Sequence, residues 1–347
     1  MLITILETIL KVVFQNLLNG IRIIITLMKS IKLKKTKSFQ TAILFLVFNR
    51  PETTSKVFNV IKELKPSRLY LAADGPRENR DGEKEKVDLV RKIVTQVDWD
   101  CDVKKLFRTK NLGCGKGVSE AITWFFQQEE EGIILEDDDL PHQDFFVFCE
   151  EMLSRYRFNN NIYTISGNNF QNGIKRGDGS YYFSKYFHSW GWATWRRSWK
   201  IYNREIVFWP KWKNSIQWKN KFSNNLEKNY WKKIFDMIYE TDFDSMAYPF
   251  NACIMYKGGL NIIPNINLVS NIGFGKNATH TTEENTIISN LKTQRLDKIV
   301  HPKSVEINQD ADKYVFEWVF GGKNLRFFRR LFLFIKKNFQ KVFNNNG

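Results

Sequence analysis

Four consecutive acidic residues, Glu136-Asp137-Asp138-Asp139, directly follow an apolar run at 132–135 that has the length of a strand. Adjacent carboxylates repel one another, and a fold can keep them together when a cation neutralises them. Carboxylate oxygens are hard ligands, which favours Mg²⁺ or Mn²⁺ shared with a diphosphate group. A solvated acidic loop is the alternative interpretation.

Other polar residues also follow apolar runs. Asn49 and Arg50 come after the run at 42–48, and Asp74 comes after the run at 68–73. Asp74 belongs to an Asp-Gly-Pro sequence, which favours a turn on its own. The glycine-rich run at 113–117 fits neither the dinucleotide fingerprint nor the complete phosphate loop, so it indicates a flexible entry to a helix rather than a phosphate cradle.

The elements that must position these residues alternate along the first half of the chain. Apolar runs predict strands at 42–48, 68–73, 103–107, 132–135 and 162–165, and amphipathic patterns predict helices at 52–64, 84–97, 117–128 and 143–157. Such alternation is typical of an α/β fold, with a mostly parallel sheet and helices on both faces. Ligands bind beyond the carboxyl ends of such strands, so the candidate residues are expected along one rim.

The second half of the chain is rich in tryptophan. Eight of the 11 Trp residues fall between Trp190 and Trp231, among Lys and Arg, and short apolar runs return only at 251–255 and 260–263. We interpret this half as a continuation of the same domain, with loops and a smaller sheet that complete the site. The indoles either pack in the interior or line a sugar or base site, and packing is expected for most of them.

The positive charge is concentrated at the two ends. Of the net +16, residues 1–40 carry +6 and residues 321–347 carry +7, so the middle is nearly balanced. Apolar residues at helical spacing in 325–342 are flanked by Arg and Lys, which is typical of a helix at an anionic membrane surface. Residues 1–28 are apolar but interrupted by Glu7, Lys11 and Arg22, so a spanning helix is not expected. Packing of both tails on the domain is the alternative.

The four cysteines show no spacing typical of a metal site. Cys101, Cys114, Cys149 and Cys253 stand apart in the sequence, which is typical of reduced thiols in an intracellular protein. Together with the basic tails, this predicts a cytoplasmic protein that is peripheral on the inner face of the cell membrane.

A set of short motifs occurs in a characteristic order. They are Phe48-Asn49-Arg50-Pro51, Ala73-Asp74-Gly75-Pro76, Asn111-Leu112-Gly113, Ile134-Leu135-Glu136-Asp137-Asp138, Ser189-Trp190-Gly191-Trp192-Ala193-Thr194-Trp195, Asp244 and Asn267-Leu268-Val269-Ser270-Asn271-Ile272-Gly273. Over about residues 41–282 the chain resembles bacterial nucleotide-diphospho-sugar transferases of GT-A (Rossmann-like) fold, sometimes labelled hemolysin-activation-like. It is more distantly similar to Golgi N-acetylglucosaminyltransferase I.

The resemblance implies an inverting, metal-dependent glycosyltransferase of surface polysaccharide or glycolipid synthesis. It implies a nucleotide-diphosphate sugar as donor, with a UDP-sugar favoured, and a hydroxyl of a saccharide or lipid-linked acceptor. Asp138 would ligate Mn²⁺ or Mg²⁺, and Asp244 would be the general base, with Asp242 as the alternative. The residues implied to bind the nucleotide sugar are Asn49, Arg50, Asp74, Asn111, Glu136, Asp137, Trp190, Gly191, Trp192 and His280.

The predicted organisation has three parts. A basic amphipathic segment at 1–40 precedes a catalytic domain at 41–320, and a basic amphipathic helix at 321–347 follows it. Within the domain, 41–167 is the nucleotide-binding half and 168–320 the acceptor half. A nucleotidyltransferase with a similar sheet is one alternative function, and a non-enzymatic nucleic-acid or membrane binder is another. The balanced central charge and the acidic rim argue against nucleic acid as a partner.

Overall fold

The computed structural model describes residues 15, 20, 39–274, 288–289 and 291–327. Contacts divide the chain into two units, Met1–Gln40 and Thr41–Gly347, and the second unit, which contains every element below, is described by itself. Most of the two predicted basic segments therefore lies outside the described residues. Within the described part of the chain, no helix is both long and apolar enough to cross a membrane.

Strands and helices alternate in the first half of the domain, as the hydrophobic pattern predicts. In chain order they are β1 (Ile43–Val47), α2 (Pro51–Leu64), β2 (Arg68–Ala73), α3 (Glu83–Val94), β3 (Asp102–Phe107), α4 (Cys114–Phe126), β4 (Glu131–Glu136), β5 (Asp139–Pro141), α5 (Gln143–Tyr156) and β6 (Ile162–Ser166). Each predicted strand and helix of this half is present, and the bounds differ by a few residues.

The second half contains shorter elements. They are β7 (Tyr181–Ser184), β8 (Trp192–Trp195), α6 (Arg196–Trp199), α7 (Trp209–Trp212), α8 (Ile216–Lys219), α9 (Asn225–Glu240), α10 (Ala247–Lys257), β9 (Leu260–Pro264), β10 (Val269–Asn271) and α11 (Gln309–Trp318). The apolar run at 251–255 lies in helix α10, whereas the run at 260–263 is strand β9.

The central sheet has eight strands in the order β3-β2-β1-β4-β8-β6-β9-β7. The first four strands pair in parallel, β8 is antiparallel to β4 and β6, and β7 is antiparallel to β9. Six of the eight strands therefore run in the same direction, which confirms the predicted α/β class. A smaller sheet is present as the antiparallel pair β10-β5, which joins one strand of each half, whereas β7, β8 and β9 of the second half belong to the main sheet.

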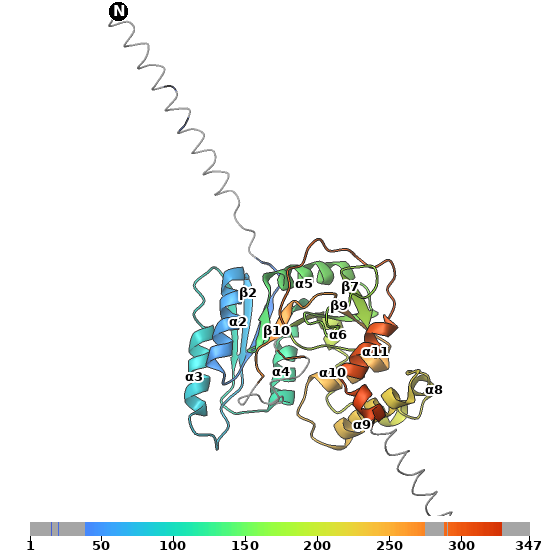
Figure 1. Ribbon diagram of the computed structural model, residues 1–347. Helices are drawn as coiled ribbons and strands as arrows, with labels where there is room; N and C mark the ends of the chain where they lie inside the picture. The colour runs from blue at the N-terminus through green and yellow to red at the C-terminus, as the bar shows by residue number, and fades with distance from the viewer. Residues whose placement is uncertain (1–14, 16–19, 21–38, 275–287, 290, 328–347) are drawn as a thin grey trace, which may run out of the picture. The chain divides into compact units, whose positions relative to one another are not determined.

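Helices cover both faces of this sheet. Leu44 and Leu46 of β1 pack with Ile122 of α4 and Ile254 of α10 in one core cluster. Side chains alternate across a strand, so the fully buried Phe45 points to the opposite face. Helix α5, which contacts β4, β6 and β8, lies over that sheet with its own apolar residues buried, and α2 and α3 lie side by side next to β2 (Figure 1).

The tryptophan-rich region is mainly core, as expected. Seven of the eight indoles between Trp190 and Trp231 are at most 5% exposed. Four of them form one cluster with Phe235, and these are Trp209, Trp212, Trp218 and Trp231. Edge-to-face contacts such as that between Trp209 and Trp218, with ring centroids 4.7 Å apart, stabilise this cluster beyond the burial of apolar area. Trp190 is the half-buried exception.

A buried carboxylate connects helix α11 to strand β7. The hydroxyl of Ser184 donates a hydrogen bond to Asp312 Oδ1 at 2.6 Å, and the backbone N–H of Lys185 donates to Asp312 Oδ2 at 3.2 Å. Burial raises the pKa of Asp312 to about 6, although the positive charge of Lys185 opposes this rise. The folded protein therefore binds a proton at Asp312 more tightly than the unfolded chain does.

This shift predicts that stability decreases as the pH rises from about 4 to about 6, because the folded state must give up a proton that it binds more tightly. Asp312→Asn removes that dependence. Between about pH 4 and pH 7, the free energy of unfolding of the variant should gain about 2 kcal/mol relative to wild type. Urea denaturation at both pH values measures this difference. Asp310→Asn, on the exposed side of the same helix, is the matched control, and an Asp312→Asn difference that is constant with pH would contradict the prediction.

Candidate functional site

The acidic run forms the reversal between β4 and β5. Strand β4 ends at Glu136, Asp137 and Asp138 make the turn, and β5 begins at Asp139. In the small sheet Asp139 pairs with Asn271 of β10, and the N–H of Ile272 donates to the backbone oxygen of Asp138 at 2.8 Å. The turn is therefore fixed at the carboxyl end of a central strand.

Arg50 reaches this turn from the loop that follows the adjacent strand β1, just before helix α2. Its Nη1 lies 2.5 Å from Asp138 Oδ2, and its Nε lies 3.4 Å from Asp137 Oδ1. The backbone N–H of Phe48 donates to Asp137 Oδ2 at 3.1 Å. Burial acts to lower the pKa of Arg50, but the charges of Asp137 and Asp138 outweigh it and raise that pKa above its ordinary value. The guanidinium thus stays charged and neutralises part of the turn.

The turn still carries more negative charge than this guanidinium can neutralise. Burial, followed by repulsion from Asp138 and Asp137, raises the pKa of Glu136, and burial likewise raises the pKa of Asp137 and Asp139. Asp139 Oδ2 accepts hydrogen bonds from the N–H groups of Glu136 and Gly191, at 3.1 and 2.8 Å. Asp139 Oδ1 is buried and has no hydrogen-bond partner among the described residues. A further cation would relieve this excess.

The carboxylates of the turn are of the chemical type that binds a divalent cation shared with a ligand. Within the described residues, no group of three or more His, Cys, Asp or Glu side chains is arranged to hold a metal ion by itself. Mg²⁺ is commonly bound by one or two carboxylates, and substrate phosphates and water complete its coordination. The hard oxygens of Asp138 and the unpartnered oxygen of Asp139 suit that arrangement.

Gly273 lies directly against the Arg50–Asp138 ion pair. A Cβ atom at this position would overlap Asp138 Oδ2 and lie 2.5 Å from Arg50 Nη1. The N–H of Gly273 donates to Asn271 Oδ1 at 3.0 Å, which holds the backbone close to the turn. In the sequence, Gly273 is only the last residue of the motif at 267–273. The one feature of the sequence that could have marked Gly273 as a site residue is its position shortly after a short apolar run.

Asp74 and Asn111 connect the loops that follow β2 and β3. Asp74 Oδ2 accepts from the N–H of Leu112 at 2.8 Å, and the amide of Asn111 donates to the backbone oxygen of Gly75 at 2.8 Å. Burial raises the pKa of Asp74. The structure thus brings these two predicted residues together. Their hydrogen bonds hold the loops after β2 and β3 against each other at the rim of the sheet.

Asn49 is held by a residue that the sequence analysis missed. Its amide donates to Glu83 Oε1 at 2.9 Å, and the N–H of Arg77 donates to Glu83 Oε2 at 2.7 Å. Glu83 is 4% exposed. Burial alone would raise its pKa, but hydrogen bonds from Arg77 and Asn49 lower it. Glu83 begins a highly charged run, and nothing in that pattern distinguishes it from a surface residue.

Asp244 lies at the N-terminus of helix α4, far from it in sequence. Its Oδ1 accepts from the N–H of Gly115 at 2.5 Å and its Oδ2 from the N–H of Cys114 at 3.3 Å. A Cβ on Gly115 would lie 2.7 Å from the backbone nitrogen of Ser245. The glycine-rich run therefore permits close approach of the Asp244 loop, and the anion at this helix N-terminus is a carboxylate of the chain itself.

The charges of both Asp244 and the acidic turn act on the thiol of Cys114. Burial raises the pKa of this thiol to about 12, and the charges of Glu136 and Asp244 act in the same direction. The N–H of Leu112, just before α4, donates to Asp74 at the carboxyl end of β2, and β2 and β4 run in the same direction, so Asp244 lies at the same edge of the sheet as the acidic turn. Asp242 and Asp244 are both exposed, but Asp242 forms an ion pair with Arg204 at 2.7 Å, whereas Asp244 is held by N–H groups at the start of α4.

The Trp-Gly-Trp motif is divided between the site and the core. Gly191 contacts Asp139 through its N–H, and Trp190 is half-buried with its ring centroid 5.6 Å from that of Phe274. Trp192 was predicted to bind the nucleotide sugar, but it is fully buried against Phe187, so its indole stabilises the core instead. His280 lies outside the described residues.

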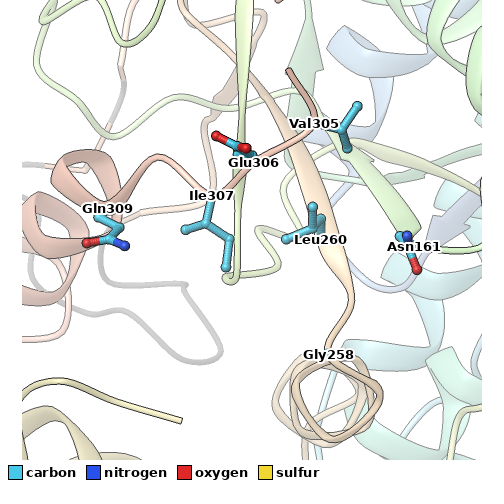
Figure 2. Close-up of a pocket in the computed structure, with 7 residues that line it drawn as sticks. All are labelled: Asn161, Gly258, Leu260, Val305, Glu306, Ile307 and Gln309. Atoms are coloured by element: carbon cyan, nitrogen blue, oxygen red, sulfur yellow. The ribbon is translucent and has the colours of Figure 1, made fainter. Parts of the chain in front are cut away.

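A cavity of about 530 Å³ lies at the other edge of the sheet (Figure 2). It is bounded by residues at the beginnings of β6 and β9 and by the segment before α11, namely Asn161, Gly258, Leu260, Val305, Glu306, Ile307 and Gln309. Since β4, β6 and β9 run in the same direction, this cavity and the acidic turn are at opposite strand ends.

No protein-family model and no curated protein matches the chain. Among solved structures, HddC from Yersinia pseudotuberculosis is 12% identical, with a TM-score of 0.29, over 49% of this chain and 86% of that one. A UDP-glucose pyrophosphorylase complexed with UDP-glucose is 11% identical, with a TM-score of 0.33, over 65% and 89% of the two chains. A 4-diphosphocytidyl-2C-methyl-D-erythritol synthase from Anaerococcus prevotii DSM 20548 is 10% identical, with a TM-score of 0.28, over 56% and 84%.

Proposed function

We propose that the protein is an inverting glycosyltransferase, which moves a sugar from a nucleotide-diphosphate donor to a hydroxyl acceptor. The observation that supports this most is that the acidic turn and Asp244 both lie at the carboxyl edge of the sheet. This edge is where ligands of such sheets bind. In this proposal the acidic turn holds the cation for a leaving diphosphate, and Asp244 is the separate carboxylate that accepts a proton.

The proposed chemistry follows from where charge develops. Cleavage of the anomeric C–O bond leaves an extra negative charge on the nucleoside diphosphate, which needs a positive partner. A divalent cation held by Asp138 would supply Lewis-acid stabilisation there. Arg50, which remains charged beside Asp138, adds a second positive group.

Asp244 would take the proton from the acceptor hydroxyl as it attacks from the opposite face of the sugar. Its carboxylate is oriented by the N–H groups of Cys114 and Gly115, so little reorganisation is needed. A single displacement of this kind inverts the anomeric configuration.

The second candidate is nucleotidyl transfer, and a UDP-glucose pyrophosphorylase is among the structures that the chain resembles. TM-scores of 0.28 to 0.33 do not choose between the two reactions. The connection from β1 to α2 favours glycosyl transfer, because it consists of Phe48, Asn49 and Arg50 and has no glycine. Pro51 at the start of α2 also removes one N–H donor. A nucleoside triphosphate is commonly cradled by a glycine-rich loop at a helix N-terminus.

A screen of nucleotide sugars with and without Mn²⁺ tests the proposal. Slow hydrolysis of the correct donor is expected to release a nucleoside diphosphate and free sugar, and chelation of the metal should abolish it. Because hydrolysis uses water as acceptor, the natural acceptor is not required. Formation of pyrophosphate from a nucleoside triphosphate and a sugar 1-phosphate would instead establish the nucleotidyltransferase, and would overturn the glycosyltransferase proposal.

A further inference from the structure

Asn168 and His188 form a buried polar pair just beyond the end of β6. Asn168 is fully buried and His188 is 5% exposed, and Asn168 Nδ2 lies 3.3 Å from His188 Nδ1. Asn168 Oδ1 and His188 Nε2 are also buried, and neither has a hydrogen-bond partner within the described part of the chain. Buried polar groups are normally paired, so two unpaired atoms in one pair need an explanation.

The two unpaired atoms have complementary roles. Burial lowers the pKa of His188 to about 3, so its imidazole is neutral. When Nδ1 accepts from the Asn168 amide, Nε2 carries the hydrogen and is an unused donor, while Asn168 Oδ1 is an unused acceptor. Reversing the amide exchanges these roles but again leaves one donor and one acceptor. A hydroxyl group, which both donates and accepts, is the neutral group that satisfies the pair.

Backbone hydrogen bonds connect this pair to the acidic turn. The N–H of Gly167, next to Asn168, donates to the backbone oxygen of Gly191 at 2.7 Å. The N–H of Gly191 donates in turn to Asp139 Oδ2 at 2.8 Å. The hydroxyl of Ser166 donates to the backbone oxygen of His188 at 2.8 Å. The pair therefore belongs to the same rim as the acidic turn.

A row of half-buried rings extends from the pair to the turn. Phe170 stacks on the imidazole of His188 with centroids 4.8 Å apart, and Trp190 meets Phe170 edge-on at 5.1 Å. Phe274 meets Trp190 at 5.6 Å, and Phe274 follows Gly273, which lies on Asp138. Flat apolar rings beside a few oriented polar groups are typical of small-molecule sites.

We propose that Asn168, His188, Phe170, Trp190 and Phe274 form a subsite for a sugar ring beside the acidic turn, with Asn168 and His188 binding one of its hydroxyl groups. This inference rests on the proposed function, because the sugar is the one attached to the diphosphate at the turn. Phe170 stacks on the imidazole, so the proposal requires its ring to move aside for the hydroxyl to reach His188.

The test compares Asn168→Leu with wild type by calorimetric titration of UDP and of UDP-glucose, UDP-galactose and UDP-N-acetylglucosamine with Mn²⁺. Asn168→Leu should weaken the tightest-binding UDP-sugar about tenfold and leave the affinity for UDP unchanged. His188→Phe, which removes the other polar group and keeps a ring, should do the same and provides a second variant if the first does not fold.

Asn261→Leu is the matched control. Asn261 is equally buried, but its amide oxygen accepts from Thr164 at 2.7 Å and its amide nitrogen donates to Ser184. This variant should have a lower Tm than wild type. The ratio of its affinity for the UDP-sugar to its affinity for UDP should be unchanged. If wild type binds a UDP-sugar and both subsite variants keep its affinity ratio, the pair is only structural and the subsite is overturned. A wild-type protein that binds no nucleotide sugar in the screen of the proposed function overturns that function, and the subsite with it.

Discussion

Asp138→Asn is expected to reduce the metal-dependent release of nucleoside diphosphate at least about a hundredfold, in the range seen when one preorganised electrostatic group is removed. The amide keeps the shape of the side chain but loses the charge that would hold the cation. It also weakens the contact with Arg50, whose Nη1 lies 2.5 Å from Asp138 Oδ2. Turnover of the donor identified in the nucleotide-sugar screen measures the effect.

The variant should remain folded, because one charge is removed from a turn in which the carboxylates repel one another. Burial and this repulsion raise the pKa of Glu136, so the turn tolerates a neutral group at the position of Glu136. Circular dichroism and Tm check the fold. Asp98→Asn is the control, because it removes an exposed carboxylate that is paired with Lys62 at 2.7 Å, and turnover should not change. Wild-type turnover in Asp138→Asn would remove Asp138 from the proposed metal site.

Asp244→Asn is expected to lower kcat by about a hundredfold or more with the affinity for the donor nearly intact, since the loss of a general base typically costs that much. The Asn side chain retains an oxygen that can accept from the N–H of Gly115, and Asn and Asp stabilise helix N-termini about equally. The Tm should therefore change little. Rates of transfer at saturating donor, together with donor titration, separate kcat from affinity.

The variant Asp242→Asn tests whether Asp244 or the nearby carboxylate Asp242 is the general base. Asp242 is exposed and paired with Arg204, so its replacement should leave both turnover and stability almost unchanged. Asp244→Ala, which also removes the acceptor for Gly115, should lower the Tm in addition to kcat. If Asp242→Asn is inactive while Asp244→Asn turns over normally, Asp242 is the base and Asp244 only orients helix α4.

Local patterns in the sequence were sufficient to predict much of the fold. The apolar run at 42–48 predicts strand β1, and the amphipathic pattern at 143–157 predicts helix α5. Each of these patterns reflects which side chains of one element must be buried, and that is a property of neighbouring residues. The acidic turn could be placed at the carboxyl rim for the same reason, because it directly follows an apolar strand.

Contacts between distant segments could not be predicted in this way. Strand β8 inserts between β4 and β6, and no periodicity in its short sequence indicates that pairing. Trp192 illustrates the consequence, since the same motif places Trp190 in the site and Trp192 in the core.

Local burial patterns along the chain were therefore enough to predict the α/β class, the tryptophan-rich interior and the edge where acidic residues gather. Only the tertiary structure showed that Asp244 lies on the N-terminus of α4, that Gly273 covers the Arg50–Asp138 pair, and that Asn168 meets His188. The physical reason is that periodicity records burial within one element. These contacts instead join backbone and side chains from segments that become neighbours only when the sheet is assembled.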